Sequence, residues 1–501
     1  AAARGKKTAA VTEADPDDPL ASQYGDLPMV QSVEVTDKKW TAVSNLTTEL
    51  ENTEVLVRAR LHAVRGKGKS AFLVLRQQLA TVQAVLFVDD TTVSKGMVKY
   101  ASAIPRESIV DITGIVAKPN VPVEGCSQSE VEIKVTSVRA VVRSEALPFE
   151  ISDAARSKDA IEKALAAGEA APTVGQDTRL DNRVVDLRTP ANQGIFRVQS
   201  AVCQAFRDFL LSKDFMEIHT PKLVPGASEG GAAVFKLDYM GRPACLGQSP
   251  QLYKQMAICA GLGKVFEIGP VFRAEFSYTH RHLCEFTGLD FEMAINESYH
   301  EVLDVVNELF VHMFEFLNNK CAKELAAINE QYPFEPLKYL PQAPRLTFAE
   351  GVELLKEAGI EVDPFGDLNT EAERALGKIV AEKYKTDFYI LHRYPQAVRP
   401  FYTMPCKDDP RYSNSYDIFI RGEEIISGAQ RIHDPVLLEQ RARDLGVPVE
   451  SIRAYIDSFK YGAPPHGGIG VGMERVVMLF CGLDNIRKTS MFPRDPKRLE
   501  P

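Results

Sequence analysis

The sequence predicts an α+β protein, in which a small β-barrel precedes a larger domain of antiparallel strands flanked by helices. Two observations lead to this fold. Short β-branched runs follow one another between residues 53 and 143, whereas the chain after residue 178 mixes long helical patterns with strand–turn–strand patterns. The chain has 501 residues. That is too long for one ordinary core, so about two to four domains are expected.

Composition narrows the class of protein. Hydrophobic residues make up 45% and charged residues 25% of the chain, as in soluble globular proteins. No apolar run approaches the roughly 20 residues that span a bilayer, so no membrane association is expected. The eight cysteines are scattered without a C-x-x-C pair, which disfavours a zinc site or a disulfide framework and favours a reducing compartment.

Four regions are expected along the chain. Residues 1–52 are polar, weakly patterned and contain three prolines, which predicts a flexible extension. Residues 53–143 form the barrel, and residues 144–178 form a linker or hinge with a short helical piece. Residues 179–501 form the main domain.

The predicted barrel has a basic run that extends from the end of its first strand to the end of its second. Five strands are expected, at residues 55–57, 72–75, 82–88, 109–112 and 131–135. Between Arg58 and Arg76 the chain carries several arginines and lysines and no acid, and Phe72 begins the strand after a Gly-Lys-Gly-Lys turn. Cations beside an aromatic are the elements of single-stranded nucleic-acid binding on an OB-fold. From these residues alone, a solvated basic hairpin with Phe72 in the core is slightly favoured.

A charged hairpin is predicted between residues 265 and 292. Apolar strands at 265–268 and 289–291 flank a loop that carries Arg273, Arg281 and several carboxylates. The planar fork of arginine suits phosphate, and Phe286 could stack on a base. A nucleotide-phosphate clamp and a surface hairpin rich in ion pairs are nearly equal interpretations of this segment by itself.

Two further segments near the carboxyl end carry chemistry. Strands at 416–420 and 424–427 bring Asp417 and Glu424 onto an antiparallel pair, where two carboxylates could hold Mg²⁺ or could simply face water from an edge. A glycine-rich run at 467–472 then precedes an apolar helix. Its glycines permit close approach to a ligand, although tight packing explains such a run equally well.

Together these segments resemble the three motifs of the class II aminoacyl-tRNA synthetases. The first is the helix at 196–211 followed by residues 215–221, the second is the charged hairpin, and the third is residues 470–475. The class I signatures H-I-G-H and K-M-S-K-S are absent from the sequence. The resemblance implies a catalytic domain on an antiparallel sheet flanked by helices.

Within that class the chain is most similar to the aspartyl-tRNA synthetases, in their eukaryotic cytosolic form. The OB-like domain and residues 178–183 resemble the lysyl, asparaginyl and aspartyl group, and residues 227–231 and 248–255 resemble its aspartyl members. The resemblance implies ATP-dependent ligation of L-aspartate to tRNA(Asp) through an aspartyl-adenylate. It also implies a homodimer formed through the first motif, and it suggests that the protein belongs to a multi-synthetase complex.

The resemblance assigns roles at the amino-acid end of the site. Residues that match the family's aspartate contacts are Ser228, Glu229, Gln251, Lys254, Arg273, Ser427 and Arg431. Lys254 and Arg431 would bind the side-chain carboxylate, because an arginine fork plus a lysine charge suit a carboxylate better than a carboxamide. The loop that contains Ser228 and Glu229 would act as a mobile lid.

The resemblance also assigns roles toward ATP, metal and tRNA. Arg273, Arg475 and Glu424 match catalytic residues, and Asp417 and Glu424 match Mg²⁺ ligands. Phe72 and Gln83 match anticodon contacts, which reverses the preference for Phe72 in the core. Residues that match ATP contacts are Arg273, Glu275, Arg281, His282, Leu283, Phe286, Glu424, Gly472, Met473, Glu474 and Arg475.

Three alternatives remain at this point. The first is an asparaginyl-tRNA synthetase, although those relatives usually have an uncharged residue where Lys254 stands. The second is an amidating or amino-acid-ligating relative, which typically lacks the anticodon barrel. The third is a non-catalytic paralogue acting as a binding protein, in which the motif residues Arg273, Glu424 and Arg475 would be expected to erode.

Overall fold

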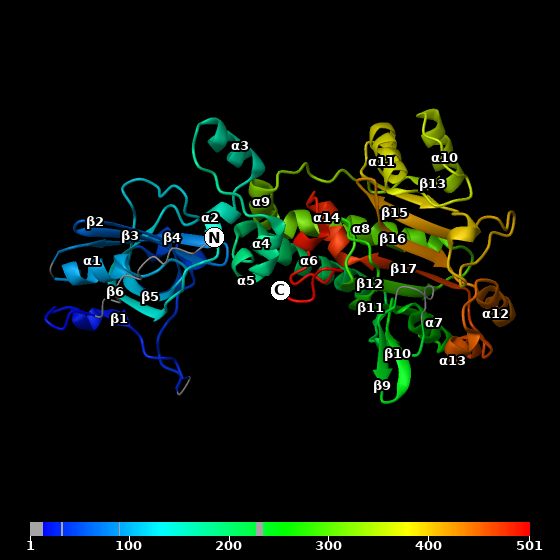
Figure 1. Cartoon of the computed structure of the whole chain (residues 1–501), viewed down its shortest axis with the longest axis horizontal. Helices are drawn as coiled ribbons and strands as arrows, with labels where there is room; N and C mark the ends of the chain where they lie inside the picture. Colours follow the sequence, from blue (N-terminus) through cyan, green and yellow to red (C-terminus); the bar gives the residue numbers. More distant parts are fainter. Residues whose placement is uncertain (1–13, 32–33, 90, 227–233) are drawn as a thin grey trace. The chain divides into compact units, whose positions relative to one another are not determined.

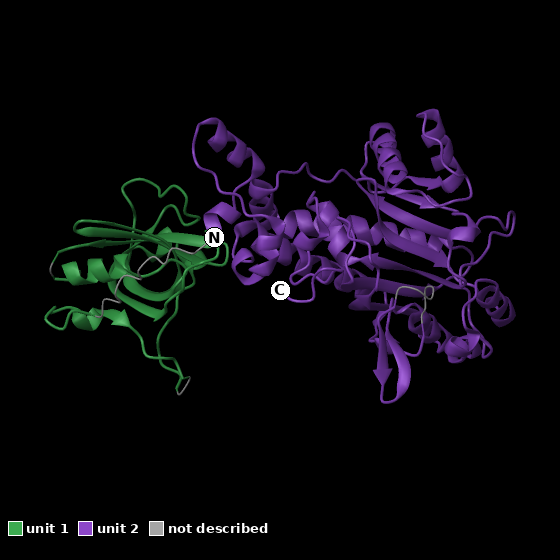
Figure 2. Ribbon diagram, viewed as in Figure 1, with its two compact units in different colours: residues 1–150 green, residues 151–501 purple. Residues whose placement is uncertain are grey.

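The computed structural model divides into two compact units, residues 1–150 and residues 151–501 (Figure 2). Within the part of the chain described, no helix has the length and apolar character needed to cross a membrane. The residues described are 14–31, 34–89, 91–226 and 234–501.

Over its described residues, unit 1 contains a six-stranded sheet in the order β1-β6-β4-β3-β2-β5, and pairing of β5 with β6 closes it into a barrel (Figure 1). The five strands predicted for this region are confirmed as β2 to β6. Their bounds, with β1, are Tyr24–Asp26 (β1), Glu54–Lys67 (β2), Ser70–Gln77 (β3), Ala80–Phe87 (β4), Ile109–Ala117 (β5) and Glu132–Val142 (β6).

The barrel follows from alternation along its strands. In β2, Val55, Val57 and Leu61 point into the core, and the residues between them face outward. A register shift next to Leu61 bends this long strand, so that it can pair with both β3 and β5. The helix α1 (Lys95–Ser102) lies between β4 and β5 in the chain, and the side chain of Ser94 caps its first turn.

The stretch before the barrel differs from the expected flexible extension over residues 14–31 and 34–52. Tyr24 is buried, lies 5.5 Å from the ring of Tyr100 and begins β1, which pairs with β6. Val43 and Leu46 are buried in the same core. These apolar side chains are spaced without helix or strand periodicity, so the sequence pattern alone did not reveal that they cover the barrel.

Over its described residues, unit 2 is built on an eight-stranded sheet in the order β13-β14-β15-β16-β17-β12-β11-β7. Most neighbours are antiparallel, and the outer pairs β13–β14 and β11–β7 are parallel. A smaller three-stranded sheet, β8-β10-β9, lies apart from it (Figure 1). The strands are Met216–Glu217 (β7), Leu223–Val224 (β8), Lys236–Tyr239 (β9), Arg242–Leu246 (β10), Lys264–Phe272 (β11), Glu285–Ala294 (β12), Arg345–Thr347 (β13), Phe388–His392 (β14), Ser415–Ile420 (β15), Glu423–Gln430 (β16) and His466–Gly472 (β17).

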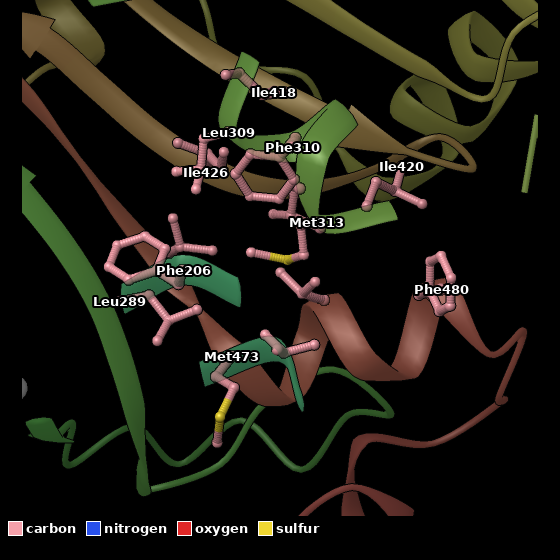
Figure 3. Packing of buried hydrophobic residues seen from close by; sticks show 14 of the residues in the cluster. Phe206, Leu289, Leu309, Phe310, Met313, Ile418, Ile420, Ile426, Met473 and Phe480 are labelled. Carbon is pink, nitrogen blue, oxygen red and sulfur yellow. The ribbon is translucent and has the colours of Figure 1, made fainter. Parts of the chain in front are cut away.

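One face of the large sheet packs against three helices, α6, α8 and α14. Figure 3 shows Phe206, Phe310 and Phe480 from these helices gathered with Leu289 and Ile426 from the sheet. The predicted helix of the first motif is confirmed as α6, which begins with Pro190 after the capping residue Thr189. The helices of unit 2 are Ile151–Ala154 (α2), Lys158–Ala166 (α3), Gln176–Asp181 (α4), Arg183–Asp186 (α5), Pro190–Ser212 (α6), Gln251–Cys259 (α7), His300–Lys320 (α8), Ala322–Gln331 (α9), Phe348–Glu357 (α10), Thr370–Tyr384 (α11), Pro435–Asp444 (α12), Arg453–Phe459 (α13) and Met473–Phe480 (α14).

The opposite face of the sheet carries the polar residues that form the site. In β12, Leu289 and Phe291 face the helices, so Asp290 and Glu292 point the other way. The paired strand β17 has glycines opposite both acids. A Cβ on Gly468 would lie 2.3 Å from a carboxylate oxygen of Glu292, so the glycine run makes room for buried charge.

Candidate active site

A cavity of about 350 Å³ opens on the polar face of the sheet in unit 2. Lys254 and Met473 are buried behind its wall, and Asp417 is separated from it by Arg399. Ser228 and Glu229 lie outside the described residues. The predicted residues that line the cavity are Gln251, Arg273, Glu275, Arg281, His282, Leu283, Phe286, Glu424, Ser427, Arg431, Gly472, Glu474 and Arg475.

At one end of the cavity, two cations share a buried carboxylate. Arg431 donates from Nε and Nη2 to the oxygens of Glu292, at 2.9 and 3.2 Å. Lys254 lies 3.5 Å from Glu292 and donates to Asp290 at 3.0 Å. Burial by itself would raise the pKa of Glu292, but Arg431 and Lys254 outweigh it and hold that pKa below its ordinary value.

The side chain of Lys254 is buried among polar partners. Its side chain is 1% exposed and donates to the carbonyl oxygen of Ile469 as well as to Asp290. A lysine that faces solvent from α7 is therefore excluded. Burial of an ammonium group is costly unless the group is paired, and here two cations and two carboxylates contact one another at this end of the cavity.

Beside this group, Arg399 holds Asp417. Its two terminal nitrogens donate to both oxygens of Asp417, at 3.0 and 2.7 Å, and one of them also reaches Ser427 at 3.1 Å. The guanidinium stacks on Tyr394 at 3.9 Å from the ring centre. Arg399 thus lines the cavity, and Asp417 lies behind it, fully engaged by a bidentate pair.

Glu424 is the carboxylate that faces the cavity from β16. Burial, and then the nearby charge of Asp417, raises the pKa of Glu424 to about 7. The strands β15 and β16 are central in the sheet, so the alternative in which these two acids face water from an edge is excluded. A cation bound beside Glu424 would favour the ionised form of this carboxyl group.

We predict that Glu424→Gln gains stability relative to the unsubstituted protein as the pH rises from 4.5 to 7. In this window the folded state keeps the proton of Glu424, whereas the unfolded state, in which the carboxyl group has its ordinary pKa of 4.5, releases it. Unfolding therefore becomes easier with rising pH in the parent protein, and glutamine removes that contribution. Urea-induced unfolding without ATP or Mg²⁺ at several pH values measures the difference.

The control for this experiment is Glu371→Gln, an exposed glutamate on α11. It should show no such trend with pH. A stability difference for Glu424→Gln that stays constant between pH 5 and 8 would contradict the assigned titration.

The other end of the cavity presents cations and an aromatic ring. Arg273 lies over the ring of Phe286, 5.5 Å from its centre. Arg475, at the start of α14, donates to the carbonyl oxygens of Glu424 and Arg281, at 2.8 and 3.2 Å. The hairpin and the third motif are therefore brought to one place, which favours the phosphate clamp over a surface hairpin.

Burial shifts the pKa of two neighbouring side chains, His282 and Glu474. Burial, together with the charge of Arg475, lowers the pKa of His282 and so favours its neutral imidazole. Burial raises the pKa of Glu474 to about 7, and its carboxyl group accepts the backbone N–H of Thr287 at 3.0 Å. Glu474 thus ties α14 to the hairpin strand β12.

In unit 1, the predicted residues Phe72 and Gln83 lie on the outer surface of β3 and β4. Phe72 is half-buried, is not part of the core, and meets the exposed ring of Phe87 edge-on at 5.6 Å. Gln83 donates to Glu132 at 3.0 Å. Arg65 on β2 pairs directly with Phe72. The outward position of Phe72 excludes the core interpretation that the residues alone had slightly favoured.

Several residues of the site were missed by reasoning from the sequence. Asp290 and Glu292 could have been found, because they alternate with apolar residues in a strand whose partner is rich in glycine. Arg399 lies outside the motif segments, as does Glu373, which accepts a hydrogen bond from Arg281, and no local pattern marks either residue.

Comparison with known proteins agrees with this geometry. A family model described as tRNA synthetases class II (D, K and N) matches residues 175–496, and one described as OB-fold nucleic acid binding domain matches residues 55–141. The chain is 59% identical to aspartate–tRNA ligase 1, cytoplasmic, of Arabidopsis thaliana, over 97% of this chain and 91% of that protein.

Two solved structures are similar over nearly the whole chain. Aspartyl tRNA synthetase from Entamoeba histolytica superposes with a TM-score of 0.88 at 47% identity, covering 96% of each chain. Asparaginyl-tRNA synthetase from Pyrococcus horikoshii, complexed with asparaginyl-adenylate, gives 0.80 at 30% identity, covering 93% of this chain and 100% of the other.

Proposed function

The chain belongs to the class II tRNA synthetases of the D, K and N group and, within it, to the aspartate–tRNA ligases, and on this premise we propose how its residues carry out the reaction. The enzyme joins L-aspartate to tRNA(Asp) at the expense of ATP. The observation that supports the choice of amino acid is the buried pair Lys254 and Arg431 around Glu292. Its relatives are named cytoplasmic, and we assign this chain to the same compartment.

Binding of aspartate would use a cation and a carboxylate at this end of the cavity. Nε and Nη2 of Arg431 are held by Glu292, which leaves the cavity side of its guanidinium for the side-chain carboxylate of aspartate. Asp290 lines the cavity and suits the α-ammonium group. Lys254 is buried behind the wall of the cavity, where its positive charge offsets the carboxylates of Asp290 and Glu292. An anionic side chain can therefore enter.

Two steps then follow. An oxygen of the aspartate α-carboxylate attacks the α-phosphorus of ATP, and the bond to the bridging oxygen breaks to release pyrophosphate. The terminal ribose hydroxyl of tRNA next attacks the carbonyl carbon, loses its proton, and AMP leaves. Because the first nucleophile is already ionised, catalysis rests on positioning and on charge stabilisation by Arg273 and Arg475.

Mg²⁺ belongs to this proposal as a counter-ion for the phosphates. The donor chemistry fits, since Glu424 is a carboxylate that lines the cavity, and burial, followed by the charge of Asp417, raises its pKa, so that a bound cation would favour its ionised form. Asp417 could join it only by sharing or releasing Arg399. Within the described residues, no cluster of three or more histidine, cysteine or acidic side chains forms a complete metal site. Bound Mg²⁺ would supply charge neutralisation of the triphosphate.

An aminoacylation assay tests the function directly. Purified enzyme is given ATP, Mg²⁺, either tRNA(Asp) or tRNA(Asn), and either aspartate, asparagine or lysine. Charging with aspartate alone is expected. The asparaginyl alternative predicts charging of tRNA(Asn) with asparagine. The identity of this chain to the solved asparaginyl enzyme, 30%, is lower than its identity to the solved aspartyl enzyme, 47%, which speaks against that alternative. A non-catalytic paralogue would charge nothing.

We also propose a homodimer formed through the first motif. Leu211 on α6 and Met216 on β7 are each 51% exposed, which leaves apolar surface on this segment. Sedimentation of the purified protein would give the mass of a dimer, and aspartate substitutions at these two positions should reduce it. Co-purification from cell extract would test the expected multi-synthetase complex.

We predict that Phe72→Ala weakens tRNA(Asp) binding by about 1–3 kcal/mol, the usual contribution of one stacked base. Phe72 faces outward, so adenylate formation without tRNA should be unchanged. Filter binding measures the first quantity, and aspartate-dependent pyrophosphate exchange measures the second. Equal loss in both assays would show that Phe72 acts through folding. Val74→Ala, at another outward position of β3, is the matched control.

A further inference from the structure

Helix α11 lies outside the three motif segments and yet supplies a side chain that pairs with a residue lining the cavity. Glu373 on this helix accepts a hydrogen bond from Nη1 of Arg281 at 2.7 Å. Both side chains are largely withdrawn from solvent, with 7% of Glu373 and 16% of Arg281 exposed. Arg281 lines the cavity, so the ion pair fixes a group that faces the substrates.

The position of Glu373 is fixed by the packing of its helix. Leu376 and Val380 on α11 are buried against strands β14 and β15. The helix also approaches the turn between β15 and β16 so closely that a Cβ on Gly377 would lie 2.4 Å from the Cα of Gly422. The side chain of Asn369 caps its first turn. A carboxylate on such a helix has little freedom to follow a moving arginine.

A second set of contacts ties the same helix to the same loop. Arg374, the next residue of α11, pairs with Glu423 at 2.7 Å. His280, which precedes Arg281, lies 3.1 Å from that carboxylate. Glu373 and Arg374, which are consecutive in the helix, therefore contact Arg281 and His280, which are consecutive in the hairpin loop.

Electrostatics give this ion pair a direct bearing on phosphate binding. Glu373 lies close enough to Glu424 to contribute to the raised pKa of that carboxyl group. The region thus contains several acids, and Arg281 is the cation that the helix holds among them. If Arg281 were free to turn toward Glu423 or Glu424, its charge would be lost to an incoming triphosphate.

We propose that Glu373 is a positioning residue, which holds the Arg281 guanidinium in the orientation that receives the phosphates of ATP. The proposal rests on the proposed function, because contact between Arg281 and ATP is part of it. Glu373 itself does not touch the substrate. Its effect passes through Arg281, so the two side chains should act as one unit.

The test is calorimetric titration with α,β-methylene-ATP and Mg²⁺, without aspartate or tRNA. Glu373→Gln keeps the shape of the side chain and removes its charge. We expect it to weaken binding of the analogue about tenfold, and to leave the aspartate KM in pyrophosphate exchange within about twofold. Arg281→Gln should weaken binding to a similar extent, and the double variant no further. Glu371→Gln, exposed on the same helix, should bind like the parent protein.

The outcomes separate the alternatives. Parent-like or tighter binding by Glu373→Gln would overturn the proposal, as would losses that add in the double variant. If Glu373→Gln melts at a lower temperature than the parent protein, Glu373→Asp is the second variant, because it keeps the charge at shorter reach. Its loss of analogue binding should then not add to the loss caused by Arg281→Gln. A parent protein that binds the analogue but never activates aspartate would overturn the proposed function and leave this inference standing.

Discussion

Lys254→Leu should abolish aspartate activation while the protein still binds ATP. The lysine is 1% exposed and is the partner of Asp290 and a neighbour of Glu292. Removing it leaves two buried carboxylates opposite one arginine, at a cost of about 3–5 kcal/mol. It also makes the pocket more negative, which repels an anionic amino acid. Aspartate-dependent pyrophosphate exchange should fall at least about 100-fold, since each 1.4 kcal/mol is a factor of ten.

Two companion variants separate lost function from lost folding. Lys378→Leu replaces an exposed lysine on α11 and should exchange pyrophosphate at the parent rate. The double variant Lys254→Leu with Asp290→Asn removes one charge of each sign, so it should recover thermal stability without recovering exchange. Exchange near the parent rate in Lys254→Leu would reject the assignment of this pocket to aspartate.

Arg273→Gln should lower the rate of aspartyl-adenylate formation by about 10²–10³-fold, the usual loss when one preorganised charge-stabilising donor is removed. Arg273 lines the cavity and lies over the ring of Phe286. There it would contact the α-phosphate of ATP at the point where the carboxylate of aspartate attacks. Its contribution grows as charge develops on the phosphorus oxygens. The loss should therefore appear in kcat, with aspartate KM little changed. Single-turnover formation of adenylate measures the chemical step without product release.

Substitution by lysine gives a graded comparison. Arg273→Lys keeps the charge but loses the planar fork that can bridge a carboxylate and a phosphate, so it should recover only part of the rate. Lys264→Gln, on the strand that leads to Arg273, is a control in the same hairpin and away from the cavity. A change confined to KM in Arg273→Gln would show that the residue binds substrates without stabilising the transition state.

The local pattern of the sequence determined the strands and hairpins of this protein. Short apolar and β-branched runs predicted the strands at 55–57 and 109–112 in the barrel and the two strands of the charged hairpin, at 265–268 and 289–291. Turn residues such as Arg421 and Gly422 predicted the hairpin that carries Asp417 and Glu424. Once the motif segments were recognised together, most of the residues that the resemblance assigned to the amino acid, ATP and Mg²⁺ proved to line the cavity.

Only the tertiary structure decided which charges meet. Arg431 and Glu292 are 139 positions apart in the chain, and Arg281 and Glu373 are 92 apart. Their contacts depend on the order of strands in the sheet and on where α11 docks, and neither property has a local signature. The same holds for Arg399, which covers Asp417, and for Tyr24, which packs on the barrel. Periodicity specifies the face on which a side chain lies, whereas the burial of apolar surface across the whole fold selects the partner that it finds there.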